Sequence, residues 1–488
     1  MKKIAVIGSG FSSLSAASHL AKAGFEVNIY EKNDSIGGRC RQLVKNGFTF
    51  DMGPSWYWMP DIFEEYFNDF GHSASDFYEL ERLDPGYQIV FKDRTLPIAA
   101  SVEGIAEAFE QIEIGSGAKL KAFLKKAATN YRIAIKKIVL RPGKSPLELV
   151  TPETVVRVGQ FLKSVSDEVK KNFKSPELRS ALEFPVLFLG AKPENTPSFY
   201  IFMNHADYGL GTWHPKGGMY EIVKGMQKVA EGLGVQIHTS SAVQQINIDA
   251  QGKAKGITLS NGEQIAADYV LSGADYHHSE TLLPERYRQY SEAYWNKRTF
   301  APSSLLFYVG FNTKLDSKLL HHNLFFDTDF KEHARVIYDQ PEWPSDPLFY
   351  ANFPSVSDAS MAPEGKEAGF FLIPIAPGIE DTQELRDRFF NLLIQRLEHF
   401  SGQELKPHIE FVESFCVNDF VEAYNSFKGN AYGLANTLRQ TAFLRPKLQS
   451  KKVNNLFFTG QLTVPGPGVP PALISGKLVA QLIQEQES

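Results

Sequence analysis

Two glycines and a glutamate near the start of the chain have the types and the spacing that bind a dinucleotide. Gly8 and Gly10 are separated by one residue, and Glu31 follows about 20 residues later. Gly8 permits a tight turn, and Gly10 lets the backbone approach a pyrophosphate. The Glu31 carboxylate can bind the hydroxyls of an adenosine ribose, whereas it would repel the 2′-phosphate of NADP. These residues therefore predict a site for a dinucleotide other than NADP.

The segments around these residues predict the elements that position them. Residues 4–7 are an apolar run typical of a buried strand, residues 12–23 have helical spacing, and residues 27–30 form a second strand that ends on Glu31. A pyrophosphate would then lie at the helix N-terminus, where N–H groups and the helix dipole favour anions. Ser13 replaces the third glycine and is small enough for close packing. An ordinary tight turn is the alternative, and it leaves Glu31 without a role.

Composition and length limit the class of protein. At 488 residues the chain exceeds the roughly 250–300 at which one core usually divides, so about two domains are expected. The net charge of −5 argues against nucleic-acid binding. The two cysteines, Cys40 and Cys416, exclude a disulfide framework and a cysteine-based metal cluster, and they fit a reducing cytoplasm. Without a signal-peptide pattern or a run of about 18 apolar residues, we expect a cytoplasmic protein that does not span a membrane.

A second glycine pair and the turn after it make the prediction more specific. Gly37 and Gly38 precede Arg39, and residues 50–54 read as a short strand that leads into a turn at Gly53. This combination resembles the flavin amine oxidase and carotenoid desaturase superfamily. The resemblance implies that both turns contact FAD. It also implies that Arg39 neutralises the FAD pyrophosphate, which a guanidinium can do with two hydrogen bonds.

The C-terminal segment carries a further part of the resemblance. Residues 456–460 are predicted to be a strand, residues 461–471 a rigid turn rich in proline and glycine, and residues 472–484 a helix. In the superfamily the N-terminus of this helix points at the flavin ring, where its dipole favours negative charge on the reduced flavin. Many members have an acid where this chain has Gln461. A neutral amide there would alter the contacts to the ribityl chain and the phosphates.

The resemblance implies a set of FAD-binding residues, among which Val243 packs on the adenine through backbone contacts. The set comprises Gly8, Gly10, Phe11, Ser12, Glu31, Lys32, Gly38, Arg39, Gly53, Pro54, Ser55, Val243, Gly460, Gln461, Gly468, Val469 and Pro470. Because these residues come from both ends and the middle of the chain, the cofactor domain is expected to be discontinuous.

The predicted fold is α/β, with a Rossmann-type FAD-binding domain and an α+β substrate domain. Residues 1–75, 225–290 and 445–488 are predicted to form the FAD-binding domain. The substrate domain would comprise residues 76–224 and 291–444, with a membrane-facing helical region at about 100–182. Beside the flavin-side turn, Trp56, Tyr57 and Trp58 are equally suited to an apolar pocket wall and to core packing.

One segment of the helical region is strongly basic. Residues 119–146 contain nine lysines and arginines and no acidic residue, and their apolar side chains recur at helical spacing. A basic amphipathic segment in an acidic protein is typical of a membrane-surface contact. The resemblance likewise implies peripheral attachment to the cytoplasmic membrane. The alternative is a solvated helix that covers the protein's own core.

Along nearly its full length the chain resembles the bacterial phytoene desaturases, most specifically in residues 8–39, 50–55, 213–219 and 460–477. The resemblance implies FAD-dependent removal of hydrogens from phytoene towards lycopene. We find no second dinucleotide fingerprint, so hydride would leave the flavin to an acceptor such as oxygen or a quinone. Because the cofactor carries the difficult chemistry, no metal site is expected and no catalytic residue is assigned. The conceivable bases are Asp51, Glu183, His205 and Asp207.

Other functions stay open at this point. A carotenoid cis–trans isomerase, or a desaturase of a later, hydroxylated carotenoid, would use the same flavin motifs. An amine oxidase would need an aromatic cage for its substrate. A non-catalytic isoprenoid-binding escort protein shares the superfamily fold but needs no flavin, so the intact Glu31, Arg39 and terminal turn argue against it.

Overall fold

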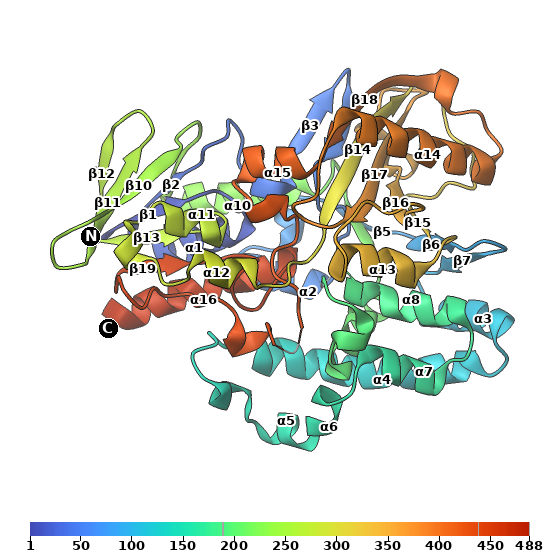
Figure 1. Ribbon diagram of the computed structural model, residues 1–488, viewed down its shortest axis with the longest axis horizontal. Coiled ribbons are helices and arrows are strands. Elements are labelled where there is room, and N and C mark those ends of the chain that lie inside the picture. The colour runs from blue at the N-terminus through green and yellow to red at the C-terminus, as the bar shows by residue number, and fades with distance from the viewer. Residues whose placement is uncertain (188–189, 438, 488) are drawn as a thin grey trace.

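A parallel sheet gathers strands from three distant parts of the chain. The computed structural model describes residues 1–187, 190–437 and 439–487, and in it five strands pair in the order β19-β13-β1-β2-β9 (Figure 1). Their bounds are β1 Lys3–Ile7, β2 Glu26–Tyr30, β9 Gln236–His238, β13 Tyr269–Ser272 and β19 Leu456–Phe458. All neighbouring pairs are parallel. The carboxyl ends therefore share one edge, which is where sheets of this kind bind ligands.

Two helices beside this sheet pack closely against each other because the residues between them are small. α1 (Phe11–Lys22) connects β1 to β2, and α16 (Val469–Glu487) follows β19 and packs along α1. A Cβ on Gly476 would lie 2.4 Å from the Ser12 carbonyl oxygen, so a side chain there would force the helices apart. Ser13 is fully buried, and its Oγ lies 2.0 Å from where a Cβ on Gly273 would be. The fingerprint's third position therefore needs a small residue, as predicted.

The C-terminal helix begins earlier than the predicted residue 472. α16 already includes Val469, because Pro470 and Pro471 lack only N–H donors that the first turn of a helix leaves unused. α10 (Tyr220–Gly232) also packs against α1. Beyond the parallel sheet lies an antiparallel sheet of β10 (Val243–Ile248), β11 (Ala254–Leu259) and β12 (Gln264–Ala266), at the left in Figure 1.

A second, larger sheet has seven strands in the order β18-β14-β17-β16-β15-β6-β7. Their bounds are β6 Tyr87–Val90, β7 Thr95–Ile98, β14 Ser303–Phe311, β15 His322–Phe325, β16 Phe349–Asn352, β17 Glu367–Ile375 and β18 Ile409–Phe415. All pairs are antiparallel except β15 with β6. Successive side chains of a strand point to opposite faces: Leu305 and Phe307 share a core cluster with α14 (Gln383–Ser401), and Leu306 belongs to the opposite face.

Residues 102–187 are largely helical, as predicted, and form the layer at the bottom of Figure 1. The helices are α3 Val102–Ile112, α4 Ser116–Ile133, α5 Pro152–Val156, α6 Val158–Phe161, α7 Val165–Asn172 and α8 Pro176–Leu187. α4 continues into a π-helical turn, Ala134–Ile138. The short helix α13 (Phe330–Tyr338) lies between this layer and the seven-stranded sheet.

The apolar face of the basic helix α4 covers the protein's own core, as the alternative interpretation predicts, while a membrane contact of its basic face stays a prediction. Its apolar residues Leu120, Phe123 and Leu124 are each at most 5% exposed and belong to the protein's own core. Two of its lysines, Lys119 and Lys126, form ion pairs with Glu113 and Glu168, and Lys137 in the following π-helical turn pairs with Glu153. The sequence correctly predicts the helical spacing, and the apolar face of the helix is covered by the protein rather than by a membrane.

The remaining elements connect these layers. They include α2 Pro60–Asn68, β3 Gln42–Lys45, β4 Phe48–Asp51, β5 Leu80–Arg82, β8 Trp213–Pro215, α9 Phe202–Asn204, α11 Tyr276–Thr281, α12 Glu292–Asn296 and α15 Val417–Tyr424. No helix in the described ranges is long and apolar enough to cross a membrane. The domain boundaries proposed from the sequence stay a prediction.

Candidate active site

A cavity of about 890 Å³ extends from the carboxyl ends of β1 and β2 to the seven-stranded sheet and the helical layer. All seventeen residues of the predicted FAD-binding set line it. The structure thus brings the two ends and the middle of the chain together at one site. The contacts of these residues with FAD stay predictions.

The glycine turn after β1 leaves room for a ligand at the N-terminus of α1. Gly8 has φ +86°, and its N–H donates to the Tyr30 carbonyl at 2.8 Å. A Cβ on Gly10 would meet no atom within 4 Å, so the absent side chain opens space. α1 has no side-chain cap and no acidic residue in its first turn. Unpaired N–H groups at such a helix start attract phosphate.

Glu31 lies at the cavity, as predicted, and it also has a structural role that the sequence did not reveal. One carboxylate oxygen accepts hydrogen bonds from Ser9 N at 3.0 Å and Ser9 Oγ at 2.7 Å. The other accepts from Asn33 N and Asn33 Nδ2, both at 2.9 Å. Glu31 is only 4% exposed. It therefore fixes the glycine turn to the end of β2, whatever it binds in addition.

Arg39 presents a cation to the cavity without an acidic partner. Its Nη2 donates to Ser426 Oγ at 2.5 Å and to the Asn430 carbonyl at 3.2 Å, and the guanidinium stacks 5.1 Å from the Tyr424 ring centroid. Its buried Nε has no hydrogen-bond partner. Among the described residues no carboxylate oxygen lies within 4.0 Å of it, and desolvation lowers its pKa. This arrangement fits an anionic ligand such as a pyrophosphate.

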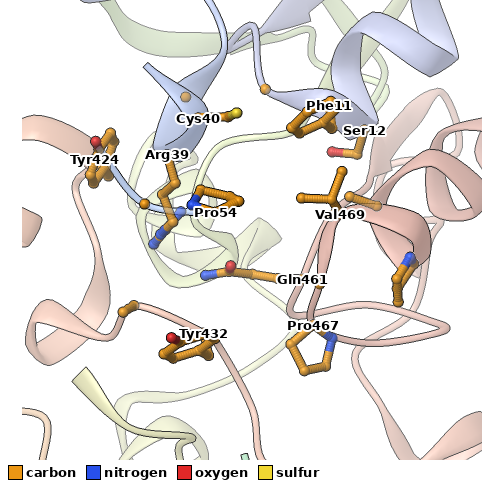
Figure 2. Close-up of a pocket in the computed structure, with 18 of the residues that line it drawn as sticks. Phe11, Ser12, Arg39, Cys40, Pro54, Tyr424, Tyr432, Gln461, Pro467 and Val469 are labelled. Atoms are coloured by element: carbon orange, nitrogen blue, oxygen red, sulfur yellow. The ribbon is translucent and has the colours of Figure 1, made fainter. Parts of the chain in front are cut away.

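Gln461 faces Arg39 in the pocket (Figure 2). With its amide oriented so that both ends are paired, the oxygen accepts from Arg39 Nη2 at 3.1 Å and the nitrogen donates to the Ala431 carbonyl at 3.3 Å. The neutral amide therefore supplies no counter-charge to Arg39, whereas the Asp275 carboxylate acts on it from beyond 4.0 Å. Lys32 also lines the cavity, but its ammonium is directed to the Glu422 carbonyl and Asn425 Oδ1.

The turn before α16 meets the start of α1. Gly460 has φ +106°, and a Cβ on it would lie 3.2 Å from Ser12 Oγ. Its N–H donates to Ser475 Oγ at 3.1 Å. Because Val469 begins α16 and also lines the cavity, the N-termini of α1 and α16 face the same space.

The rest of the cavity is apolar. Its floor is a row of directly paired residues on one face of the seven-stranded sheet: Leu306 pairs with Leu372, Leu372 with Tyr350, and Tyr350 with Leu324. Four phenylalanines line the side towards the helical layer, namely Phe161, Phe184, Phe199 and Phe202.

The aromatic run beside the flavin-side turn divides between wall and core. Trp56 and Trp58 line the cavity, whereas Tyr57 is fully buried and stacks on Phe63. Both interpretations of this run are therefore correct, for different residues.

None of the four conceivable bases lines the cavity. Asp51 instead accepts from the backbone N–H groups of Met219 and Tyr220 at 2.7 and 3.2 Å, at the start of α10. Burial raises its pKa to about 6. Asp207 accepts from Tyr87 Oη at 2.6 Å, and burial raises its pKa far above the ordinary value. His205 and Glu183 are likewise absent from the wall.

His333 does line the cavity, and no sequence signal pointed to it. Its Nδ1 accepts from Leu348 N at 2.9 Å, so its Nε2 carries the proton and donates to the Pro374 carbonyl at 2.8 Å. Burial lowers its pKa to about 4. Both nitrogens are occupied, and His333 is therefore a neutral structural residue. The cavity as a whole is suited to holding a cofactor and an apolar ligand rather than to acid–base chemistry.

Comparisons with known proteins agree with this geometry. The family described as flavin containing amine oxidoreductase matches residues 11–484. The chain is 39% identical over 487 residues to a carotenoid 3,4-desaturase of Haloarcula japonica, covering 99% of this chain and 98% of that one. It is 33% identical over 491 residues to a zeta-carotene-forming phytoene desaturase of Myxococcus xanthus, covering 98% and 93%. An oxidoreductase structure from Methanosarcina mazei shares the fold, with a TM-score of 0.65, 19% identity and coverage of 98% and 100%.

Proposed function

Because the chain belongs to the flavin containing amine oxidoreductase family, we propose that it is an FAD-dependent desaturase of a carotenoid. The observation that carries the proposal is the continuity of the cavity. Glycine turns, two helix N-termini and an arginine without an ion-pair partner in the described ranges form one end, and an aromatic and aliphatic chamber forms the other. A long hydrocarbon in the chamber would thus lie against a cofactor at the other end.

The residues of this chain would bind and orient both ligands. Gly10, the start of α1 and Arg39 would hold the pyrophosphate of FAD, with Glu31 at the adenosine ribose and the start of α16 at the flavin ring. When bound, FAD supplies the acceptor for hydride from the substrate. The apolar floor would align the polyene and exclude water. Since the sequence carries no second dinucleotide fingerprint, oxygen or a quinone would reoxidise the flavin.

The substrate we propose is phytoene, desaturated towards lycopene. A later-step desaturase is the second candidate, and a specific observation favours it: the identity to the carotenoid 3,4-desaturase, 39%, exceeds the 33% to the phytoene desaturase. Feeding phytoene and a hydroxylated carotenoid separately in liposomes, anaerobically with FAD, distinguishes the two. We expect flavin bleaching and longer-wavelength polyene absorption with the true substrate. Isomerisation without loss of hydrogen would refute desaturation, and a purified protein without flavin absorbance would favour an escort protein.

We further propose that the chain docks on the cytoplasmic membrane through residues 147–162 rather than through α4. Five apolar side chains of this segment are more than half exposed, namely Leu147, Val150, Val155, Val156 and Leu162. Exposed apolar groups of this kind can insert at a lipid interface. Within the segment, Phe161 lines the cavity, so a docked segment would join the lipid phase to the substrate chamber.

The docking segment can be tested with a matched control. V156D and L162D together should release the protein from carotenoid-loaded liposomes in a flotation assay. I114D is the control, since Ile114 is 92% exposed but belongs to the α3–α4 connection. Equal membrane binding by both variants and the unmodified protein would refute docking through this segment.

A further inference from the structure

Arg445 is a buried cation whose hydrogen-bond partners are all neutral. It is 2% exposed. Its Nη2 donates to the Leu434 carbonyl at 2.9 Å and to Asn436 Oδ1 at 2.6 Å, and its Nη1 donates to the Gln461 carbonyl at 3.2 Å. Its buried Nε has no partner, and no ion pair joins it to a carboxylate anywhere in the described ranges.

Arg445 does not line the cavity itself but lies directly behind residues that do. Two of its partners, Asn436 and Gln461, line the cavity. The turn between β19 and α16 also passes close to it, because Arg445 Nη2 lies 3.2 Å from where a Cβ on Gly466 would be. Gln461 stands between two arginines: its side chain contacts Arg39, and its backbone carbonyl contacts Arg445.

A buried charge without a counter-charge is unfavourable unless something compensates it. Burial lowers the pKa of Arg445 to about 10, so the side chain keeps its proton at neutral pH. Its field reaches into the cavity with little screening, because solvent and salt are excluded from the space around it. The missing counter-charge therefore belongs in the cavity, next to the β19–α16 turn.

We propose that Arg445 stabilises the negative charge that flavin gains on reduction and thereby raises the reduction potential of the bound cofactor. This inference rests on the proposed flavin function. Arg39 has a different role, since a pyrophosphate carries the same charge in both redox states. Arg39 therefore governs the affinity for FAD and Arg445 the potential.

Three variants test the proposal through the midpoint potential of bound FAD, measured by equilibration with redox dyes. R445M removes the charge and should shift the equilibrium at least tenfold towards oxidised flavin, which is about 30 mV for two electrons. R445K keeps the charge and should stay within about threefold of the unmodified protein. R445Q removes the charge but keeps an amide that can donate to the same carbonyls, and it should shift the equilibrium in the direction of R445M.

The outcomes separate a charge effect from a structural one. An unchanged potential in R445M, or an equal shift in R445K and R445M, would overturn the proposal. Should R445M fail to fold, R445Q decides, because an unchanged potential there overturns the proposal as well. Failure of the unmodified protein to bind FAD would instead refute the proposed function, so the two failures are distinguishable.

Discussion

Glu31 lines the cavity and also accepts four hydrogen bonds, and these bonds allow the effect of replacing it to be predicted. In E31Q one end of the side chain becomes an amide nitrogen. If this nitrogen lies towards Ser9, it faces the Ser9 N–H, and if it lies towards Asn33, it faces the Asn33 N–H. The Ser9 hydroxyl and the Asn33 amide can rotate to accept, but a backbone N–H cannot. One buried donor is therefore left unpaired, at about 1–3 kcal/mol, and the charge assistance of the other bonds is lost.

We expect E31Q to lower the free energy of unfolding of the cofactor-free protein by about 2–3 kcal/mol. Urea titration of apoprotein measures this, and fluorescence quenching of FAD measures the affinity. S9A is the control. It removes one hydroxyl donor and leaves the carboxylate intact, so about 1 kcal/mol should be lost. If Glu31 served only the ribose, E31Q would weaken FAD binding while the apoprotein kept its stability within about 0.5 kcal/mol. That result would refute the structural role.

Three other perturbations follow from the site. R39M should weaken FAD binding about 30- to 100-fold, because a charge-assisted pair of hydrogen bonds is lost, and equilibrium dialysis measures this. L372W should fill the chamber floor and abolish polyene turnover while FAD retention stays unchanged; loss of flavin would contradict the assignment. Because the unfolded chain binds a proton near pH 6.5 and folded His333 only near 4, stability should fall as pH falls through that window, by up to about 3 kcal/mol. H333Q should flatten this part of the unfolding profile.

The parts of the site that the sequence predicted are those fixed by short segments. A turn, a helix start and the acid after β2 lie within one strand–helix–strand unit, so their spacing alone determines their geometry. The floor of the chamber was beyond this reasoning, since Leu306 and Leu372 become neighbours only through the register of β14 with β17. Arg445 could not be singled out for the same reason, because its partners Leu434 and Asn436 lie in one segment and Gln461 lies in another.

The basic helix shows a different limit. Periodicity identified the apolar face of α4, but a pattern of this kind does not say what covers that face. Burial of Leu120 and Phe123 assigns the face to the core. The exposed apolar residues lie instead in 147–162, where short helices and irregular turns give no sustained period to recognise. The exposure of a side chain depends on the whole fold. The proposal that residues 147–162 rather than α4 dock on a membrane therefore needed the structure.

The charge distribution around the cavity also bears on the class of substrate. Arg39 and Arg445 both approach it without ion-pair partners in the described ranges, and Gln461, which contacts both of them, is neutral. The carboxylates on the wall, Glu31 and Asp275, lie at the carboxyl ends of β2 and β13, away from the apolar floor. An amine, which is a cation at neutral pH, would find no counter-charge at that floor. A neutral hydrocarbon carries no such penalty, so the same flavin fold in this chain favours a polyene over an amine.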